Sequence, residues 1–328
     1  MNRPIASILG TGRYLPERVL TNAELERRIA TSDEWIRSHT GIAERRISAD
    51  GELTSDMATA AAQRALAKAG LGPKDVDAII VATITPDYTF PATACVIQHK
   101  LGAPQAFAFD IQAACSGFIY GLSVAEGLIA AGTARHVLVV GAEKLSTITD
   151  WEDRNTCILF GDGAGAVVLG PAGDRGRLHS VYLGADGSMV PKLLQPGGGS
   201  ACPASAESVA QRLHYLKMDG KAVFKFAVRI MGEASAEAAR RAGWESKDIS
   251  LFIPHQANLR IVEASAKYMG LPMERVFVDL DKYGNTSAAS VAIALDEAQE
   301  QGRLRGGDKL VMVAFGGGLT WASCAIQW

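Results

Sequence analysis

The chain contains one segment that recurs in its second half, and this repeat limits the folds that are open to it. AG-LGPKDVDAIIVA, which starts at Ala69, aligns with AG-WESKDISLFIPH, which starts at Ala242. The same alignment places the apolar run Val137–Val140 on Leu310–Val313. A chain of 328 residues has room for about two domains of the usual ~150 residues. We therefore predict an internal duplication whose first half ends near residue 172.

Both halves alternate apolar runs of strand length with segments of helical periodicity. Residues 77–85 and 107–111 are typical of buried strands, and residues 55–70 are typical of an alanine-rich helix. Strands that alternate with helices predict mainly parallel sheets covered by helices. We expect an N-terminal half over residues 1–172, which carries a nucleophilic cysteine, and a C-terminal half over residues 173–328.

Cys115 lies where a predicted strand turns directly into a predicted helix. Residues 116–131 carry apolar side chains at helical spacing, and Gly132 closes this segment. A thiol at a helix N-terminus faces unpaired N–H groups and the positive end of the helix dipole, which favour a reactive thiolate. The alternative is a small buried thiol packed between strand and helix, and the position of Cys115 alone does not decide between them.

Two polar residues of the second half also follow predicted strands. His255 stands in PHQANLR after an apolar run, and Asn285 stands in YGNTSAAS, which a slightly shifted alignment of the halves places over Cys115. In α/β folds ligands usually bind at strand ends, so we expect the three side chains to meet there. Cysteine supplies a nucleophile, while His and Asn donate hydrogen bonds to a developing oxyanion. Taken singly, each residue also fits a structural histidine or a helix cap.

Three glycines follow a further predicted strand, at positions 316–318. Because no Cβ intervenes, their N–H groups can approach a substrate oxygen closely. We therefore count this segment among the candidates for the site.

Composition and motifs exclude several classes of protein. Lys and Arg total 33 against 35 Asp and Glu, which leaves no basic excess for nucleic acid. No stretch approaches the ~18 apolar residues of a membrane span, and the opening MNRPIASILGTG is too short in apolar residues for a secretory signal. We expect a cytoplasmic protein. The five cysteines form no C-x-x-C pair and the six histidines are scattered, which argues against a disulfide framework and a metal site.

The motifs AACSGF, FGDGAGAVVL, PHQANLR, GNTSAAS and AFGGGLTW occur in this order along essentially the full chain. This combination resembles β-ketoacyl-acyl-carrier-protein synthase III of the thiolase superfamily. The resemblance implies an acyltransferase with a thiolase-like duplicated α-β-α-β-α layered fold, with mixed, mainly parallel sheets. It further implies a homodimer that needs no metal or redox cofactor.

The resemblance also implies the reaction, a decarboxylative Claisen condensation of an acyl-CoA starter with malonyl-acyl carrier protein that initiates type II fatty-acid synthesis. Cys115 would carry the acyl group as a thioester. His255 and Asn285 would stabilise the enolate oxygen when the malonyl group loses CO2. The N–H groups of Cys115 and Gly317 would form the oxyanion hole for attack on the thioester.

Substrate contacts follow from the same resemblance. The implied contacts are Trp35 and Arg154 on the CoA adenine, Asn258 and Arg260 along the phosphopantetheine tunnel, Phe90 and Phe224 in the acyl pocket or tunnel, and Lys225 with Arg260 toward the acidic carrier protein. His39 and Lys221 depart from the family pattern, which often has arginine and asparagine there, so nucleotide contacts near them are open. The charged surroundings of Trp35 also fit a half-buried anchor beneath a solvated face.

Three competing functions are weighed against this one. A related synthase of a specialised pathway, with another starter or acceptor, is the nearest. A papain-like protease has the same chain order Cys, His, Asn, and the long separation of Cys115 from His255 is compatible with it, but its local cysteine signature is missing. A catalytically silent binding protein would bind acyl-CoA without labelling of Cys115.

Overall fold

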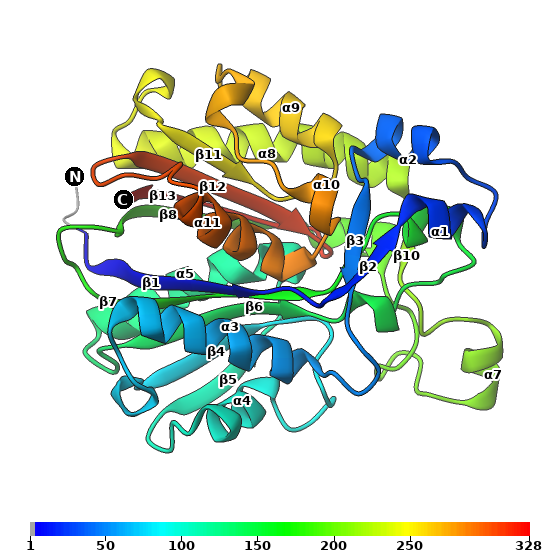
Figure 1. Ribbon diagram of the computed structural model, residues 1–328, viewed down its shortest axis with the longest axis horizontal. Helices are drawn as coiled ribbons and strands as arrows, with labels where there is room; N and C mark the ends of the chain where they lie inside the picture. Colours follow the sequence, from blue (N-terminus) through cyan, green and yellow to red (C-terminus); the bar gives the residue numbers. More distant parts are fainter. Residues whose placement is uncertain (1–3) are drawn as a thin grey trace.

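The computed structural model describes residues 4–328, which form alternating layers of helix and sheet (Figure 1). Two pairs of helices cover the outer faces, and a third pair lies between the two parts of the sheet. From one outer face to the other these helices are α3 (Thr54–Ala69) and α4 (Thr93–Leu101), then α5 (Gly117–Ala130) and α11 (Ser290–Glu300), then α8 (Gly220–Ala242) and α9 (Leu259–Tyr268). The predicted layered α/β architecture is confirmed.

Among residues 4–328, hydrogen bonds join nine strands in the order β11-β12-β13-β8-β1-β7-β6-β4-β5. These strands are β1 (Ala6–Tyr14), β4 (Ala78–Ala82), β5 (Phe107–Ile111), β6 (Val137–Glu143), β7 (Gly163–Pro171), β8 (Arg177–Ala185), β11 (Leu251–Pro254), β12 (Lys309–Gly316) and β13 (Thr320–Gln327). β1 and β8 are in register only where Ser7 lies opposite Arg177. Beyond that point the strands diverge around α5 and α11 (Figure 1).

The sheet is mixed, as predicted, but it is not mainly parallel. β4 pairs in parallel with β5 and β6, and β11 pairs in parallel with β12. The antiparallel pairs are β1–β7, β1–β8, β6–β7, β8–β13 and β12–β13. Parallel neighbours need a long crossover, whereas residues 317–319 alone connect β12 to β13. Such a short connection returns the chain in the opposite direction.

The two halves share one strand register. Ala78 of β4 lies opposite Val137 of β6, and Leu251 of β11 lies opposite Leu310 of β12. The alignment of Ala69 with Ala242 carries both members of the first pair onto the second. This agreement supports a duplication divided between residues 172 and 173, which we retain as a proposal.

The same alignment relates two turns that precede the central helices. The 3-10 turns Ala114–Ser116 and Ser287–Ala289 begin at residues with positive φ, 45° at Ala114 and 49° at Ser287. The predicted alignment of Asn285 with Cys115 is therefore wrong. Insertions and deletions between the halves leave the registers of strands and turns intact, and those registers fix the equivalent position of Cys115 as Ala288.

Side chains of one strand enter two different cores. Ala78 and Ile80 of β4 face the central core around α5 and α11, while Ile79 and Val81 face the outer core around α3 and α4. Successive residues of a strand point to opposite faces, so a strand covered on both sides is apolar throughout. This explains the unbroken apolar run that marks β4 in the sequence.

The smaller elements gather mainly at the end of the layers where β12 finishes, on the right of Figure 1. They are β2 (Arg18–Thr21), α1 (Asn22–Glu26), α2 (Asp33–Thr40), β3 (Glu44–Ile47), α6 (Arg154–Cys157), β9 (Leu193–Leu194), α7 (Ala206–Ala210), β10 (Lys217–Met218) and α10 (Leu280–Tyr283). No helix within residues 4–328 has the length and apolar character needed to cross a membrane.

Candidate active site

A cavity of about 730 Å³ opens at this end of the layers. Cys115, His255 and Asn285 line it together, although they come from distant parts of the chain. The wall is otherwise largely apolar. Its apolar side chains include Ile84, Leu145, Ile148, Leu159, Phe160, Leu193, Leu216, Met218, Val223 and Phe315. A dry cavity strengthens the electrostatic effect of the few polar groups that it contains.

Cys115 occupies the 3-10 turn that leads into α5, and a residue of β13 holds this turn in place. Ser116 Oγ lies 2.7 Å from Thr320 Oγ1, and both hydroxyls donate to the carbonyl oxygen of Ala113, at 2.7 and 2.8 Å. The nucleophile of the first half is thus anchored to a strand of the second half.

The Cys115 thiol does not have the lowered pKa that a helix N-terminus predicts. Its side chain is buried, and burial raises the pKa of the thiol to about 12, while the nearby Ser287 hydroxyl lowers it and Glu143 raises it. Burial disfavours a charged sulfur because the apolar wall cannot solvate it. Cys115 therefore rests as a thiol, and its proton needs an acceptor when the sulfur reacts.

The glycine segment after β12 packs directly on the cysteine turn. A Cβ on Gly316 would collide with the backbone nitrogen of Cys115, and one on Gly317 would lie 3.8 Å from Ala114 Cβ. Only glycine at position 316 permits this approach. The backbones of Cys115 and Gly317 consequently lie side by side on the cavity wall, as the predicted oxyanion hole requires.

His255 follows β11 and is held on two sides. Its backbone nitrogen donates to the carbonyl oxygen of Val313, at 2.7 Å, and its Nδ1 lies 2.6 Å from Ser290 Oγ. The edge of the ring contacts Phe315. Burial lowers the pKa of His255 to about 3, so the imidazole is neutral near pH 7. With Nδ1 bonded to Ser290, Nε2 is the nitrogen that serves the cavity; the sequence reasoning did not find this serine.

Asn285 is held by the first half of the chain. Its backbone nitrogen donates to the carbonyl of Leu159 at 2.8 Å, and its carbonyl accepts from the nitrogen of Gly161 at 3.0 Å. Oδ1 accepts from the nitrogen of Ser287 at 2.8 Å, which leaves Nδ2 as the donor of this side chain. The side chain thus fixes the turn before α11 and also presents an amide to the cavity, so the cap reading and the site reading both apply.

Asp162 explains why the motif FGDGAG matters at this site. Its buried carboxylate accepts hydrogen bonds from the nitrogen and Oγ of Ser48, both at 2.9 Å, and from the nitrogen and Oγ of Ser146, at 2.8 and 2.6 Å. These bonds fix the segment whose Gly161 holds Asn285. The sequence signal was the motif itself, which was quoted for the resemblance without a role for its aspartate.

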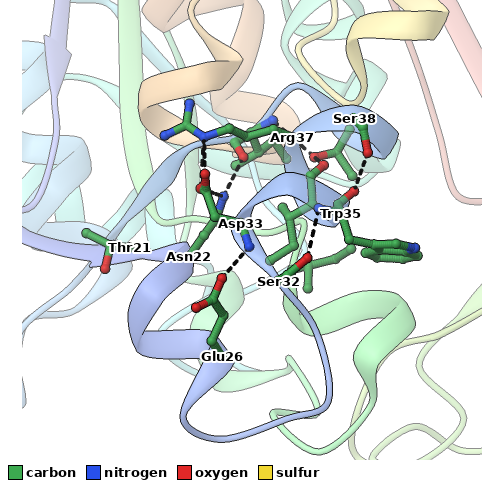
Figure 2. A network of polar contacts seen from close by, with 12 residues as sticks. Thr21, Asn22, Glu26, Ser32, Asp33, Trp35, Arg37 and Ser38 are labelled. Atoms are coloured by element: carbon green, nitrogen blue, oxygen red, sulfur yellow. Dashed lines mark hydrogen bonds and ion pairs between the residues drawn. The ribbon is translucent and has the colours of Figure 1, made fainter.

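α2 presents Trp35 at the protein surface, and Figure 2 shows the contacts that hold it. Ser32 Oγ accepts from the nitrogen of Trp35, while Asn22 and Arg37 both donate to the Asp33 carboxylate at 2.8 Å. Glu26 also accepts from the nitrogen of Asp33. The indole ring points away from these contacts (Figure 2).

Trp35, His39 and Arg154 form a stack. The ring centroids of Trp35 and His39 are 4.2 Å apart, and the guanidinium carbon of Arg154 lies 4.0 Å from the centroid of the indole. The structure therefore brings together the two residues predicted to hold adenine, although an adenine between them requires Arg154 to move. Arg45 is fully buried and donates to Leu20, Asn22 and Ile158, so the face beneath Trp35 is not a solvated one.

Asn258 and Arg260 connect the cavity to α2. Asn258 lines the cavity, and its Nδ2 donates to the carbonyl of His39 at 2.9 Å. Arg260 is exposed, and one of its guanidinium nitrogens donates to the carbonyl of Ser38 at 2.8 Å. Both side chains thus join α9 to the C-terminal end of α2, beside the Trp35 stack.

Phe224 lines the cavity and Lys225 is exposed beside it, as predicted. Phe90 does not line this cavity: it is 89% exposed on the loop before α4. Its predicted place in the wall of its own chain's acyl pocket is therefore wrong, because residues 84–92 carry the ring outward. The segment Leu193–Gly199, which looked like a connecting loop, contributes instead to the wall.

Comparisons with known proteins cover the whole chain. Family models described as 3-oxoacyl-acyl-carrier-protein (ACP) synthase III and its C-terminal part match residues 109–187 and 239–328. A β-ketoacyl-acyl-carrier-protein synthase III of Caldanaerobacter subterraneus is 56% identical over 323 residues, which are 98% of this chain and 98% of that relative.

Two solved structures have the same fold. One is a 3-oxoacyl-acyl-carrier-protein synthase III from Aquifex aeolicus, 48% identical, with a TM-score of 0.91 over 98% of this chain and 100% of the other. The second is a priming β-ketosynthase from a polyketide biosynthetic pathway, 39% identical, with a TM-score of 0.91 over 99% and 96% of the two chains. The thiolase-like architecture and the similarity stated from the motifs are thereby confirmed.

Proposed function

The chain belongs to the β-ketoacyl-acyl-carrier-protein synthase III family, and from this premise we propose that its cavity performs the initiating condensation of type II fatty-acid synthesis. An acyl-CoA starter and malonyl-acyl carrier protein give β-ketoacyl-acyl carrier protein, CO2 and CoA. The observation that carries the proposal is the meeting of Cys115, His255 and Asn285 on one apolar wall.

Cys115 is the proposed acyl carrier. Its sulfur attacks the acyl-CoA carbonyl, and CoA leaves as the thiol ester forms on the enzyme. The N–H groups of Cys115 and Gly317 then face the oxygen of that ester, supported by the close packing of Gly316 on the cysteine turn. Backbone donors placed in advance stabilise the tetrahedral oxyanion without reorganisation during the reaction.

His255 and Asn285 are the proposed donors to the malonyl thioester oxygen. Ser290 donating to Nδ1 gives the tautomer with hydrogen on Nε2, and the Asn285 amide offers Nδ2. Loss of CO2 makes an enolate, whose negative oxygen these two donors stabilise. The neutral state of His255, maintained by burial, fits a hydrogen-bond donor better than an acid.

The CoA nucleotide and the pantetheine arm are proposed to follow Trp35, Arg154, Asn258 and Arg260. Support comes from the continuous path that leads from Asn258 on the cavity wall to the carbonyl of His39 and then to the Trp35 stack. His39 takes part in the stack, so its place next to the nucleotide is compatible with ring contacts rather than with a bidentate phosphate contact.

We also propose a homodimer formed along β5. This strand is at the edge of the sheet, where unpaired backbone groups invite a further strand, and Phe107 on it is 40% exposed. Phe90 then belongs to the interface side of the molecule. The cytoplasmic location stays a prediction from the sequence.

Lys225 offers a test of carrier-protein docking. Lys225→Ala is expected to raise the KM for malonyl-acyl carrier protein about threefold to fivefold, because one exposed charge contributes at most about 1 kcal/mol. Acylation by acyl-CoA should stay unchanged. Lys247, an exposed lysine paired with Glu245 on another part of the chain, supplies the control Lys247→Ala. Arg260 is less selective since its bond to Ser38 also positions α2. Equal losses with both substrates would remove Lys225 from the docking surface.

Intact-protein mass spectrometry tests the function directly. The enzyme is incubated with acetyl-, isobutyryl- or longer acyl-CoAs, and malonyl-acyl carrier protein is then added. An adduct on Cys115 that is discharged only by the malonyl partner, with β-ketoacyl product on the carrier, is the expected result. An adduct that malonyl-acyl carrier protein does not discharge would favour the related synthase with another acceptor. No adduct with any acyl-CoA would contradict the proposal.

A further inference from the structure

Glu143 is a buried carboxyl group next to the proposed site that the mechanism above does not use. It ends β6, and its Oε2 accepts from Thr83 Oγ1, Ile84 N and Thr85 Oγ1 at 3.2, 3.1 and 2.5 Å. Oε1 accepts only the longer contact from Ile84, at 3.3 Å, so it is the freer oxygen. A fully buried carboxyl group is uncommon, because burial disfavours its charge.

Ser287 stands between this carboxyl group and Cys115. It lines the cavity, is 1% exposed, and its hydroxyl faces both the Cys115 sulfur and the Glu143 carboxyl group. Within residues 4–328, Ser287 Oγ has no partner at ordinary hydrogen-bond distance and angle. A buried hydroxyl without a fixed partner is costly, so its presence here calls for a role in some step of the reaction.

The backbone at Ser287 is also unusual. Its φ of 49° lies in the left-handed region that favours glycine, and its nitrogen donates to Asn285 Oδ1 at 2.8 Å. The surrounding fold must therefore hold the conformation that aims the hydroxyl at Cys115. The equivalent residue of the other half, Ala114, adopts a φ of 45°, which shows that alanine is accommodated in this conformation.

We propose that Ser287 and Glu143 form a proton relay for Cys115: as the sulfur attacks acyl-CoA, the thiol proton passes to Ser287 Oγ while the hydroxyl proton of Ser287 passes to the Glu143 carboxylate. This inference rests on the proposed function, in which Cys115 carries the acyl group. Ser287 touches the reacting sulfur, and Glu143 acts through Ser287 as the terminal acceptor.

The protons and bonds of the two half-reactions balance. In acylation the S–H bond of Cys115 and the bond from the acyl carbon to the CoA sulfur break, and the bond from Cys115 sulfur to the acyl carbon forms. CoA leaves as a thiolate and takes a proton from solvent, while Glu143 keeps the proton of Cys115. In condensation the enolate carbon displaces Cys115 as a thiolate, which then recovers that proton from Glu143 through Ser287.

His255 is the obvious competing acceptor, and two observations disfavour it. Burial lowers its pKa to about 3, whereas burial raises the pKa of Glu143 to about 7, so Glu143 is the stronger base. In addition, an Nε2 that donates hydrogen to the enolate oxygen is not free to accept a proton from Cys115. The titratable group that faces Glu143 is Cys115 itself; the neighbouring Lys144 turns its ammonium to the carbonyl of Glu52.

Single-turnover acylation of the full chain tests the relay. Wild-type protein, Ser287→Ala and Glu143→Gln are mixed with acetyl-CoA or isobutyryl-CoA, whichever acylates the wild type, and adduct formation is followed by quenched intact-mass measurement. Each substitution is expected to slow acylation at pH 7 about 100-fold or more, the usual contribution of general acid–base catalysis. Ser235→Ala, which removes a buried hydroxyl bonded to the Met231 carbonyl away from the cavity, should acylate normally.

The pH profile separates proton transfer from a structural role. The relay needs an ionised acceptor, so wild-type acylation should rise with pH through about 7, the pKa of Glu143, and then level off. In Ser287→Ala the proton can leave only to solvent, so the rate should keep rising above pH 7 without that plateau. Because Ala114 shows that alanine fits this backbone, Ser287→Ala should melt like the wild type even if Glu143→Gln does not fold.

Wild-type rates and profile in Ser287→Ala would overturn the relay while leaving the acyl-enzyme intact. Equal loss of acylation and malonyl decarboxylation, with a lowered melting temperature, would also overturn it and would assign Ser287 a structural role. Absence of an adduct in the wild type would instead contradict the proposed function itself.

Discussion

Cys115→Ser is expected to form no acyl adduct when incubated with acyl-CoA, with a rate lower by a factor on the order of 10⁴ or more. A serine hydroxyl is a far weaker nucleophile than a thiol, because it ionises much less readily and the apolar wall cannot solvate an alkoxide. The replacement differs by one atom in a buried turn, so the fold should persist. Intact-protein mass spectrometry over time gives the measurement.

The control for this substitution is another thiol of the same chain. Cys95 is exposed on α4 and does not line the cavity, so Cys95→Ser should acylate like the wild type. Calorimetric binding of CoA to Cys115→Ser checks that the cavity is intact. An acyl adduct of unchanged yield in Cys115→Ser would show that the nucleophile is a different residue.

His255→Ala and Asn285→Ala are expected to separate the two half-reactions. Each variant should still accept an acyl group on Cys115, because neither side chain bonds to that residue, but decarboxylation of malonyl thioester should fall about 10²-fold to 10³-fold. The reason is that each loses one donor to the enolate oxygen. Release of CO2 from malonyl-acyl carrier protein and the acyl-enzyme mass are measured on the same samples.

His179→Ala supplies the matched histidine control. His179 stacks on Trp244 and does not line the cavity, so its removal should leave both half-reactions unchanged. Normal decarboxylation in His255→Ala or Asn285→Ala would remove the role assigned to that residue. Failure of either variant to acylate would mean that the division of labour between the half-reactions is wrong.

The two half-reactions make opposite demands on one apolar cavity. Burial raises the pKa of the Cys115 thiol to about 12, which keeps the nucleophile protonated, and the same burial keeps His255 neutral. A neutral donor suits the enolate, whereas a protonated thiol needs a base. The pairing of Ser287 with Glu143 resolves this conflict without placing a permanent charge in contact with the substrate.

Much of the fold was predictable because its signals are local or repeated. The strand β4 appears as an apolar run, α3 as an alanine-rich helix and the cysteine turn as a change from one pattern to the other. The repeat that begins at Ala69 and again at Ala242 also predicted two related halves. Periodicity and turn residues act over neighbouring positions, so they are legible without knowing what packs where.

Predictions that depended on surroundings were the ones that failed. The helix N-terminus was expected to lower the pKa of Cys115, but the apolar wall raises it. Phe90 was expected in the acyl pocket, but its loop carries it outward. One alignment of the halves placed Asn285 over Cys115, but the two equivalent turns place Ala288 there.

By itself the sequence determined which residue types stand at the turns: a cysteine at 115, a histidine at 255 and an asparagine at 285. Only the tertiary structure decided what those residues contact. Ser290 selects the nitrogen that His255 presents, Gly161 holds Asn285 from the other half, and Ser287 faces both Cys115 and Glu143. Burial and hydrogen-bond partners come from segments that are far apart in the chain, and no local pattern records which of them the fold brings together.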